Sequence, residues 1–114
     1  MTILYGIHNC DTVKKAQSWL NQQSVSYQFH DLRKDGLSRD LLTDFFRQND
    51  WQTLVNKRST TFRNLPAEIK DNLTEEVAFN TILEQPTLLK RPLLAHNQQL
   101  HLGFKPAQYQ ELFS

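Results

Sequence analysis

The sequence is poor in cysteine: among its 114 residues there is one, Cys10. No disulfide can form within the chain, which agrees with a reducing compartment. A redox cycle between two cysteines of the same chain is excluded for the same reason. If Cys10 takes part in thiol exchange, the second thiol must come from another molecule.

Long apolar runs and a strong net charge are also absent. No run approaches the roughly 20 apolar residues that cross a bilayer. No basic and apolar leader stands at the start, so we expect a cytoplasmic protein without membrane contact. A net charge of +1 argues against direct nucleic-acid binding, which usually needs a basic excess over the whole domain.

Glycine-rich loops and metal-ligand clusters are missing as well. Three glycines cannot build a phosphate loop of the Walker or Rossmann type. The four histidines do not cluster with Cys10 at a metal-ligand spacing. We therefore expect neither a metal site nor a bound cofactor.

The residues that are present suit a soluble globular protein. The hydrophobic fraction is 39% and the charged fraction 22%, both ordinary values. A chain of this length fits one domain, and we expect residues 1–114 to form a single domain.

The first thirty residues have the pattern strand, helix, strand. Residues 3–7 are apolar and strand-like, and residues 26–30 alternate with the period of two of a half-buried strand. Between them, Asp11 or Thr12 can cap a helix. The buried stripe of that helix, at spacing i, i+3 and i+7, consists of Val13, Ala16 and Leu20. This order predicts a βαβ opening.

The middle of the chain is predicted to be helical. Ser38 can cap a helix that Asn49 ends. Residues 51–65 have an irregular pattern typical of a loop with short helical pieces. Thr74, followed by two glutamates, begins another helix, and Pro86 stops it.

The C-terminal part predicts two strands and a helix. Residues 88–95 are expected to enter a strand behind a proline. Asn97-Gln98 are expected to form a hairpin turn, and residues 100–102 the returning strand. A last helix contains Tyr109. The whole order, with strands at both ends and helices between and around them, is that of the α/β class.

Cys10 lies where the first strand ends and the first helix begins. Unpaired N–H groups of a first helical turn favour a thiolate, which is the reactive form of cysteine. Lys14 and Lys15 oppose the helix dipole there, unless a thiolate or an anionic substrate compensates them. A lone cysteine, however, often only packs in a core. His8 is either an acid–base partner of Cys10 or a solvent-facing residue.

The run from Tyr5 to Ala16 resembles the opening of the arsenate reductase (ArsC) family. It is most similar to the YffB-like branch, which is related to the Spx regulators. The resemblance continues through residues 31–36, 54–61 and 90–93, in the same order, and so covers nearly the whole chain. It implies an α/β, thioredoxin-like fold with a helical insertion (ArsC-type) between the two halves of the sheet.

The resemblance also implies a reaction. In the ArsC family the cysteine that matches Cys10 attacks arsenate, and glutathione with glutaredoxin completes the reduction. An arginine before a cis proline binds the oxyanion, and these residues match Arg91 and Pro92. The planar fork of arginine suits an oxyanion or a carboxylate.

Two positions depart from the arsenate reductase pattern. The family's two further arginines fall on Asn56, which Lys57 and Arg58 follow, and near Lys105. These changes favour a larger, less charged substrate such as glutathione or a glutathionylated protein. Whether Arg58 or Lys105 replaces the missing arginines stays open.

The leading hypothesis is a glutathione-dependent thiol reductase, an oxidoreductase with Cys10 as its nucleophile and glutathione as co-substrate. The expected binding residues are Asn9, Thr12, Lys14, Asn56, Lys57, Arg58, Arg91 and Pro92. Two points stay open: whether another small thiol takes the place of glutathione, and whether glutaredoxin is a partner protein.

Two alternatives stand beside this hypothesis. The first is an arsenate reductase that uses glutathione and glutaredoxin. The second is a non-enzymatic, Spx-like partner-binding regulator. The regulators carry a Cys-x-x-Cys switch whose second position here is Val13, so that switch is absent. Binding to RNA polymerase has no supporting feature in the sequence.

Overall fold

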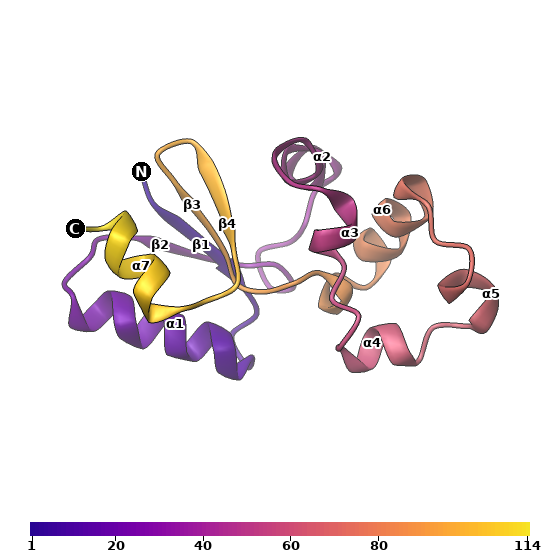
Figure 1. Cartoon of the computed structure of the whole chain (residues 1–114), viewed down its shortest axis with the longest axis horizontal. Helices are drawn as coiled ribbons and strands as arrows, with labels where there is room; N and C mark the ends of the chain where they lie inside the picture. Colours follow the sequence, from indigo (N-terminus) through magenta and orange to yellow (C-terminus); the bar gives the residue numbers. More distant parts are fainter. The chain divides into compact units, whose positions relative to one another are not determined.

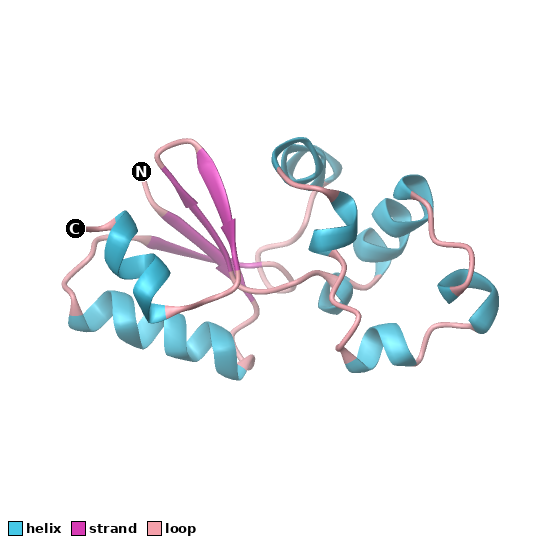
Figure 2. Cartoon of the chain, viewed as in Figure 1, coloured by secondary structure: helices cyan, strands magenta, loops and turns pink.

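The computed structural model describes residues 1–114 and consists of two compact units (Figures 1 and 2). The first, here called the sheet unit, contains Met1–Gly36 and Arg91–Ser114. The second, the helical unit, contains Leu37–Lys90 and is inserted in the sequence between the two halves of the first. The predicted α/β fold with a helical insertion is confirmed.

The sheet unit has a four-stranded sheet in the order β2-β1-β3-β4. Its strands are β1 (Ile3–Gly6), β2 (Gln28–Asp31), β3 (Leu93–His96) and β4 (Gln99–Leu102). β1 is parallel to β2, whereas β3 is antiparallel to both β1 and β4. The parallel pair is joined by helix α1 (Asp11–Gln22), as the predicted βαβ opening requires.

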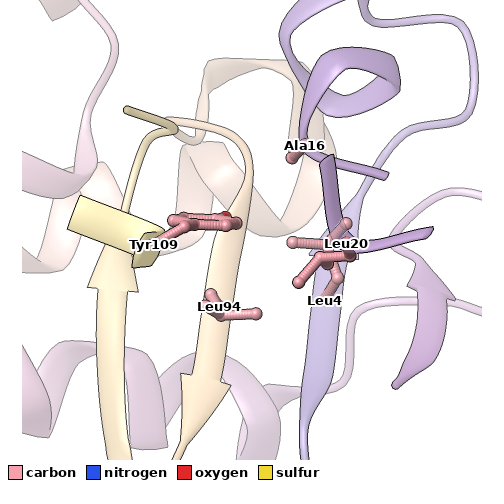
Figure 3. Close-up of a cluster of buried hydrophobic side chains, with 5 residues drawn as sticks. All are labelled: Leu4, Ala16, Leu20, Leu94 and Tyr109. Atoms are coloured by element: carbon pink, nitrogen blue, oxygen red, sulfur yellow. The ribbon is translucent and has the colours of Figure 1, made fainter. Parts of the chain in front are cut away.

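Helices α1 and α7 (Pro106–Leu112) cover the same face of this sheet (Figure 1). Leu4 of β1 and Leu94 of β3 are directly opposite each other and therefore point to one face. Their side chains meet Leu20 of α1 and Tyr109 of α7 in a buried cluster (Figure 3). Burial of each such side chain contributes roughly 1.5–3 kcal/mol, so this cluster fixes α1 against β1.

The predicted hairpin turn is confirmed, and one of its two residues is a glutamine, which is uncommon at positive φ. Asn97 and Gln98 both have positive φ, 52° and 65°. A two-residue hairpin loop with positive φ at both positions matches the right-handed twist of its strands. Asparagine tolerates this conformation well, and glutamine does so at a greater cost.

The strand that residues 88–95 enter begins behind Pro92, as expected. β3 begins only at Leu93, because Pro86–Leu88 form a 3₁₀ helix, η1. Leu89 makes an isolated bridge to Val55 within the helical unit. The apolar residues before Pro92 are therefore core residues of the insertion and not sheet residues.

The helical unit contains five α-helices besides η1. They are α2 (Arg39–Gln48), α3 (Trp51–Leu54), α4 (Thr60–Arg63), α5 (Ala67–Lys70) and α6 (Glu75–Glu84). Ser38 accepts a hydrogen bond from the N–H of Leu41 at 3.1 Å, and Thr74 accepts one from Val77 at 3.2 Å. Each such cap is worth about 1 kcal/mol. Both predicted caps are confirmed. No helix in the structure has the length and apolar character of a membrane span.

Candidate functional site

Cys10 is itself the N-cap of α1, so the expectation of Asp11 or Thr12 as the cap is wrong. The N–H of Cys10 donates to the carbonyl of Ile7 at 3.1 Å, and the carbonyl of Cys10 accepts from the N–H of Lys14 at 3.0 Å. The first bond closes a turn over residues 7–10, and the second begins the helix. Because the turn fixes where the helix starts, Asp11 becomes its first residue.

The side chain of Cys10 is neither capped nor fully buried. Its side chain makes no capping hydrogen bond and it is only partly buried. The alternative of a cysteine packed in the core is therefore wrong. As an N-cap its side chain adjoins the free N–H groups of the first turn of a 12-residue helix, which favour an anion.

Arg91 supplies a positive charge beside this cysteine. Burial lowers the pKa of Arg91, the charge of Cys10 raises it, and the charge of Arg33 lowers it further. An arginine remains protonated under all these influences. Its Nε is buried and has no hydrogen-bond partner. The peptide bond from Arg91 to Pro92 is cis, as the resemblance implies.

A small cavity of about 240 Å³, here called the side pocket, adjoins the turn before Cys10. One wall comes from the turn after β1 and the other from the segment that ends β2. Its lining residues are Ile7, His8, Asn9, Asp31, Arg33 and Lys34.

Asp31 joins the two walls of the side pocket. Its Oδ2 accepts from the N–H of His8 at 3.2 Å and lies 3.0 Å from Nδ1 of the His8 ring. Its Oδ1 accepts from the N–H groups of Arg33 at 2.9 Å and Lys34 at 3.0 Å. The side chain of Asp31 is only 4% exposed, and it is the one charged residue among the buried ones.

The hydrogen bonds keep this buried carboxylate ionised. Burial alone raises the pKa of the Asp31 carboxyl. Hydrogen bonds from the backbone N–H groups of Lys34 and Arg33, and from the side chain and backbone of His8, outweigh burial and lower that pKa to about 2. Sequence reasoning missed this role. The available signal was an aspartate at the end of a strand, before residues that form a turn.

The side chain of His8 is 74% exposed, which agrees with the solvent-facing alternative. Its Nδ1 also lies 3.0 Å from Oδ2 of Asp31. The carboxylate oxygen at Nδ1 favours the tautomer with the proton on Nδ1, which leaves Nε2 facing outward.

The expected binding residues divide between the two units. Those that lie with Cys10 in the sheet unit are Asn9, Thr12, Lys14, Arg91 and Pro92. Asn9 lines the side pocket, and Thr12 and Lys14 are exposed on the first turn of α1. Pro92 is buried.

The other three, Asn56, Lys57 and Arg58, belong to the helical unit. The side chain of Asn56 accepts a hydrogen bond from the N–H of Arg58 at 3.1 Å. Its N–H donates to the carbonyl of Leu88 at 2.8 Å. Asn56 therefore has a structural role in the turn before α4. Lys57 and Arg58 are both exposed.

The chain is similar in sequence to other bacterial proteins over all or most of its length. It is 44% identical over 114 residues, all of both chains, to an uncharacterised protein of Haemophilus influenzae. It is also 31% identical over 106 residues to the global transcriptional regulator Spx of Streptococcus mutans. This alignment covers 91% of the present chain and 77% of Spx.

Two solved structures show the same fold. The protein YffB is 39% identical to this chain and superposes on it with a TM-score of 0.94. The superposition covers 100% of both chains. An arsenate reductase (ArsC) related protein of Brucella melitensis is 42% identical with a TM-score of 0.82, over 99% of this chain and 94% of that one. Together with the sheet order, these similarities confirm the thioredoxin-like fold of the ArsC type.

The family follows from a direct match. Residues 5–112 fit the sequence profile of the ArsC family, so the match extends over both units. It includes Cys10 and the Arg91-Pro92 pair, the residues on which the resemblance rests. The chain belongs to the ArsC family.

Proposed function

We propose that this protein is a glutathione-dependent thiol reductase in which Cys10 is the nucleophile. The observation that carries the proposal is a partly exposed cysteine at a helix N-cap, with the charge of Arg91 acting on it. A helix N-terminus and a neighbouring cation are the settings in which reactive cysteines are found in proteins. The family membership supports redox chemistry at this position.

The reaction proceeds in two exchanges. The Cys10 thiolate attacks the glutathione sulfur of a mixed disulfide, forms a Cys10–glutathione disulfide and releases the other thiolate, which takes a proton from solvent. The thiolate of a free glutathione then attacks the glutathione sulfur of that adduct. Glutathione disulfide leaves, and the Cys10 thiolate is restored. Two molecules of glutathione supply the two sulfurs of the product, because the chain has no second cysteine.

Arg91 and Pro92 bind the glutathione unit next to the reacting sulfur. The guanidinium of Arg91, a residue that is only partly buried, donates to a carboxylate, a charge-assisted bond that is stronger than a neutral one. Pro92 shapes the surface beside the sulfur. Asn9, Thr12 and Lys14 supply amide, hydroxyl and ammonium groups on the same unit.

Steady-state turnover tests this function. We expect the protein to release thiol from a glutathionylated peptide when glutathione and a glutathione disulfide reductase are present, and Cys10→Ser to lose this activity. An Arg91→Lys variant retains the charge but not the fork, and we expect a raised KM for the glutathionylated peptide. Turnover that persists in Cys10→Ser would contradict the proposal.

Arsenate reduction is the second candidate, favoured by the similarity to the arsenate reductase related protein of Brucella melitensis. Cys10 would attack arsenate, and glutathione with glutaredoxin would complete the reduction. The argument against it is that Asn56 stands where the family has an arginine. Arsenate-dependent turnover with glutathione and glutaredoxin, lost in Cys10→Ser, establishes this activity. No turnover at millimolar arsenate removes it.

A regulatory function is the third candidate, favoured by the similarity to Spx of Streptococcus mutans. It requires a protein partner such as RNA polymerase and does not require a reactive thiol. Binding of purified RNA polymerase that is unchanged in Cys10→Ser, together with the absence of thiol turnover, favours this function over both enzymes.

A further inference from the structure

The side pocket carries positive charge that the fold does not neutralise. Arg33 and Lys34 line it, both are exposed, and neither side chain forms an ion pair. The one carboxylate in its lining, Asp31, is occupied by hydrogen bonds from three residues. The charges of Arg33 and Lys34 are therefore available to an anionic group.

Arg33 is also coupled to the reactive centre. Its charge acts on Arg91, and Arg91 in turn interacts with Cys10. Asn9, the residue directly before Cys10, lines the side pocket. The pocket therefore lies next to the position of a molecule whose sulfur is bonded to Cys10.

The pocket is held in a fixed shape. Asp31 binds the backbone of His8 on one wall and the backbones of Arg33 and Lys34 on the other. Because the side chain that joins the walls is buried, the bonds are shielded from competing water. The cationic side chains therefore project from a rigid support.

We propose that the side pocket binds a carboxylate of the thiol substrate, with Arg33 as its principal contact and Lys34 as a second. The proposal rests on the thiol reductase function and names the feature of the substrate that is recognised. A cavity of about 240 Å³ is smaller than those that hold whole drug-sized ligands, roughly 300–1,000 Å³. It suits one carboxylate-bearing arm of a tripeptide such as glutathione, which has a second carboxylate for Arg91.

The test compares two disulfides that differ in charge. Wild type, Arg33→Gln and Lys34→Gln each react with glutathione disulfide, which is anionic, and with bis(2-hydroxyethyl) disulfide, which is uncharged. The rate constant for adduct formation at Cys10 is measured by mass spectrometry. Arg47→Gln is the matched control, because it removes one exposed arginine charge from the helical unit.

We expect Arg33→Gln to slow the reaction with glutathione disulfide about tenfold, the equivalent of one charge-assisted contact. Lys34→Gln slows it less, and Arg47→Gln leaves it within about twofold. None of the three changes the rate with the uncharged disulfide. Arg33→Lys recovers part of the loss, and added salt weakens the preference for the anionic disulfide.

The outcomes separate this proposal from the function on which it rests. If Cys10 reacts with both disulfides but Arg33→Gln slows both equally or neither, the side pocket does not recognise the carboxylate. If wild-type Cys10 reacts with neither disulfide, the thiol reductase function is contradicted, and the carboxylate subsite with it. The disulfide of esterified glutathione lacks the carboxylate charges. If its rate of reaction with Cys10 is the same in wild type and Arg33→Gln, the assignment to a carboxylate is supported.

Discussion

The carboxylate of Asp31 lies 3.0 Å from Nδ1 of His8, and the same carboxylate accepts the backbone N–H of that histidine. This pair ties the end of β2 to the turn that leads into Cys10. The geometry of the turn before Cys10 therefore depends on a buried charge from a different strand. Removing that charge changes the site without touching the cysteine.

Acid titration of stability tests the role of Asp31. Its pKa is lowered from an ordinary 3.8 to about 2 in the folded chain. A lowered pKa stabilises the fold above pH 4, and this contribution is lost as the pH falls from about 4 to 2. It amounts to about 2 kcal/mol. We expect Asp31→Asn to be less stable than wild type in urea at pH 6, with the difference shrinking toward pH 2. A difference independent of pH contradicts the argument.

Replacement of Arg91 separates reactivity from stability. We expect Arg91→Met to slow alkylation of Cys10 by iodoacetamide roughly three- to tenfold at pH 7, because a neighbouring positive charge is lost. The buried Nε has no partner, and a buried unpaired donor costs about 1–3 kcal/mol. Methionine keeps the apolar packing, so the free energy of unfolding should not fall by more than about 1 kcal/mol. Equal alkylation rates in Arg91→Met and wild type contradict a role for Arg91 at Cys10.

Replacement of Cys10 by serine is expected to abolish activity and, at the same time, to improve the N-cap of α1. Serine is a preferred N-cap residue and its hydroxyl can accept an N–H of the first turn, whereas Cys10 makes no such bond. We expect Cys10→Ser to be inactive and yet more stable than Cys10→Ala by about 1 kcal/mol. The two variants are compared by urea unfolding. Identical stabilities would show that residue 10 is not an effective cap.

Gly6 is required by the close approach of α1 to β1. A Cβ at Gly6 would lie 2.7 Å from Cγ2 and 2.9 Å from Cγ1 of Val13. We expect Gly6→Ala to destabilise the fold by about 1–3 kcal/mol through overpacking. Val13→Ala removes both methyl groups, so the double variant should be more stable than the sum of the single effects. Strict additivity in urea unfolding contradicts this contact.

Local patterns in the sequence were sufficient for most of the fold. The stripe of Val13, Ala16 and Leu20 is buried as its spacing indicates, and Ser38 and Thr74 cap their helices. These features depend on neighbours within a turn or two of the helix. Apolar character alone does not show that Leu89 pairs with Val55 in the helical unit while the strand begins only at Leu93.

Only some of the residues of the candidate site could be predicted from the sequence. Cys10 and Arg91 were identified from a motif, and the structure brings them together in one unit. Asp31 and Arg33 were missed as site residues because their role depends on strand register. Gly6 is paired with Asp31 in the parallel ladder, which sets the end of β2 beside the turn after β1. Such a register involves residues 25 positions apart, and no local pattern specifies it.

The most direct measurement of the central claim is the mass of the intact protein after exposure to glutathione disulfide at pH 7. We expect one glutathione adduct, located on Cys10 by peptide mapping, which free glutathione then removes. A chain that stays unmodified while its thiol remains intact would contradict Cys10 as the nucleophile.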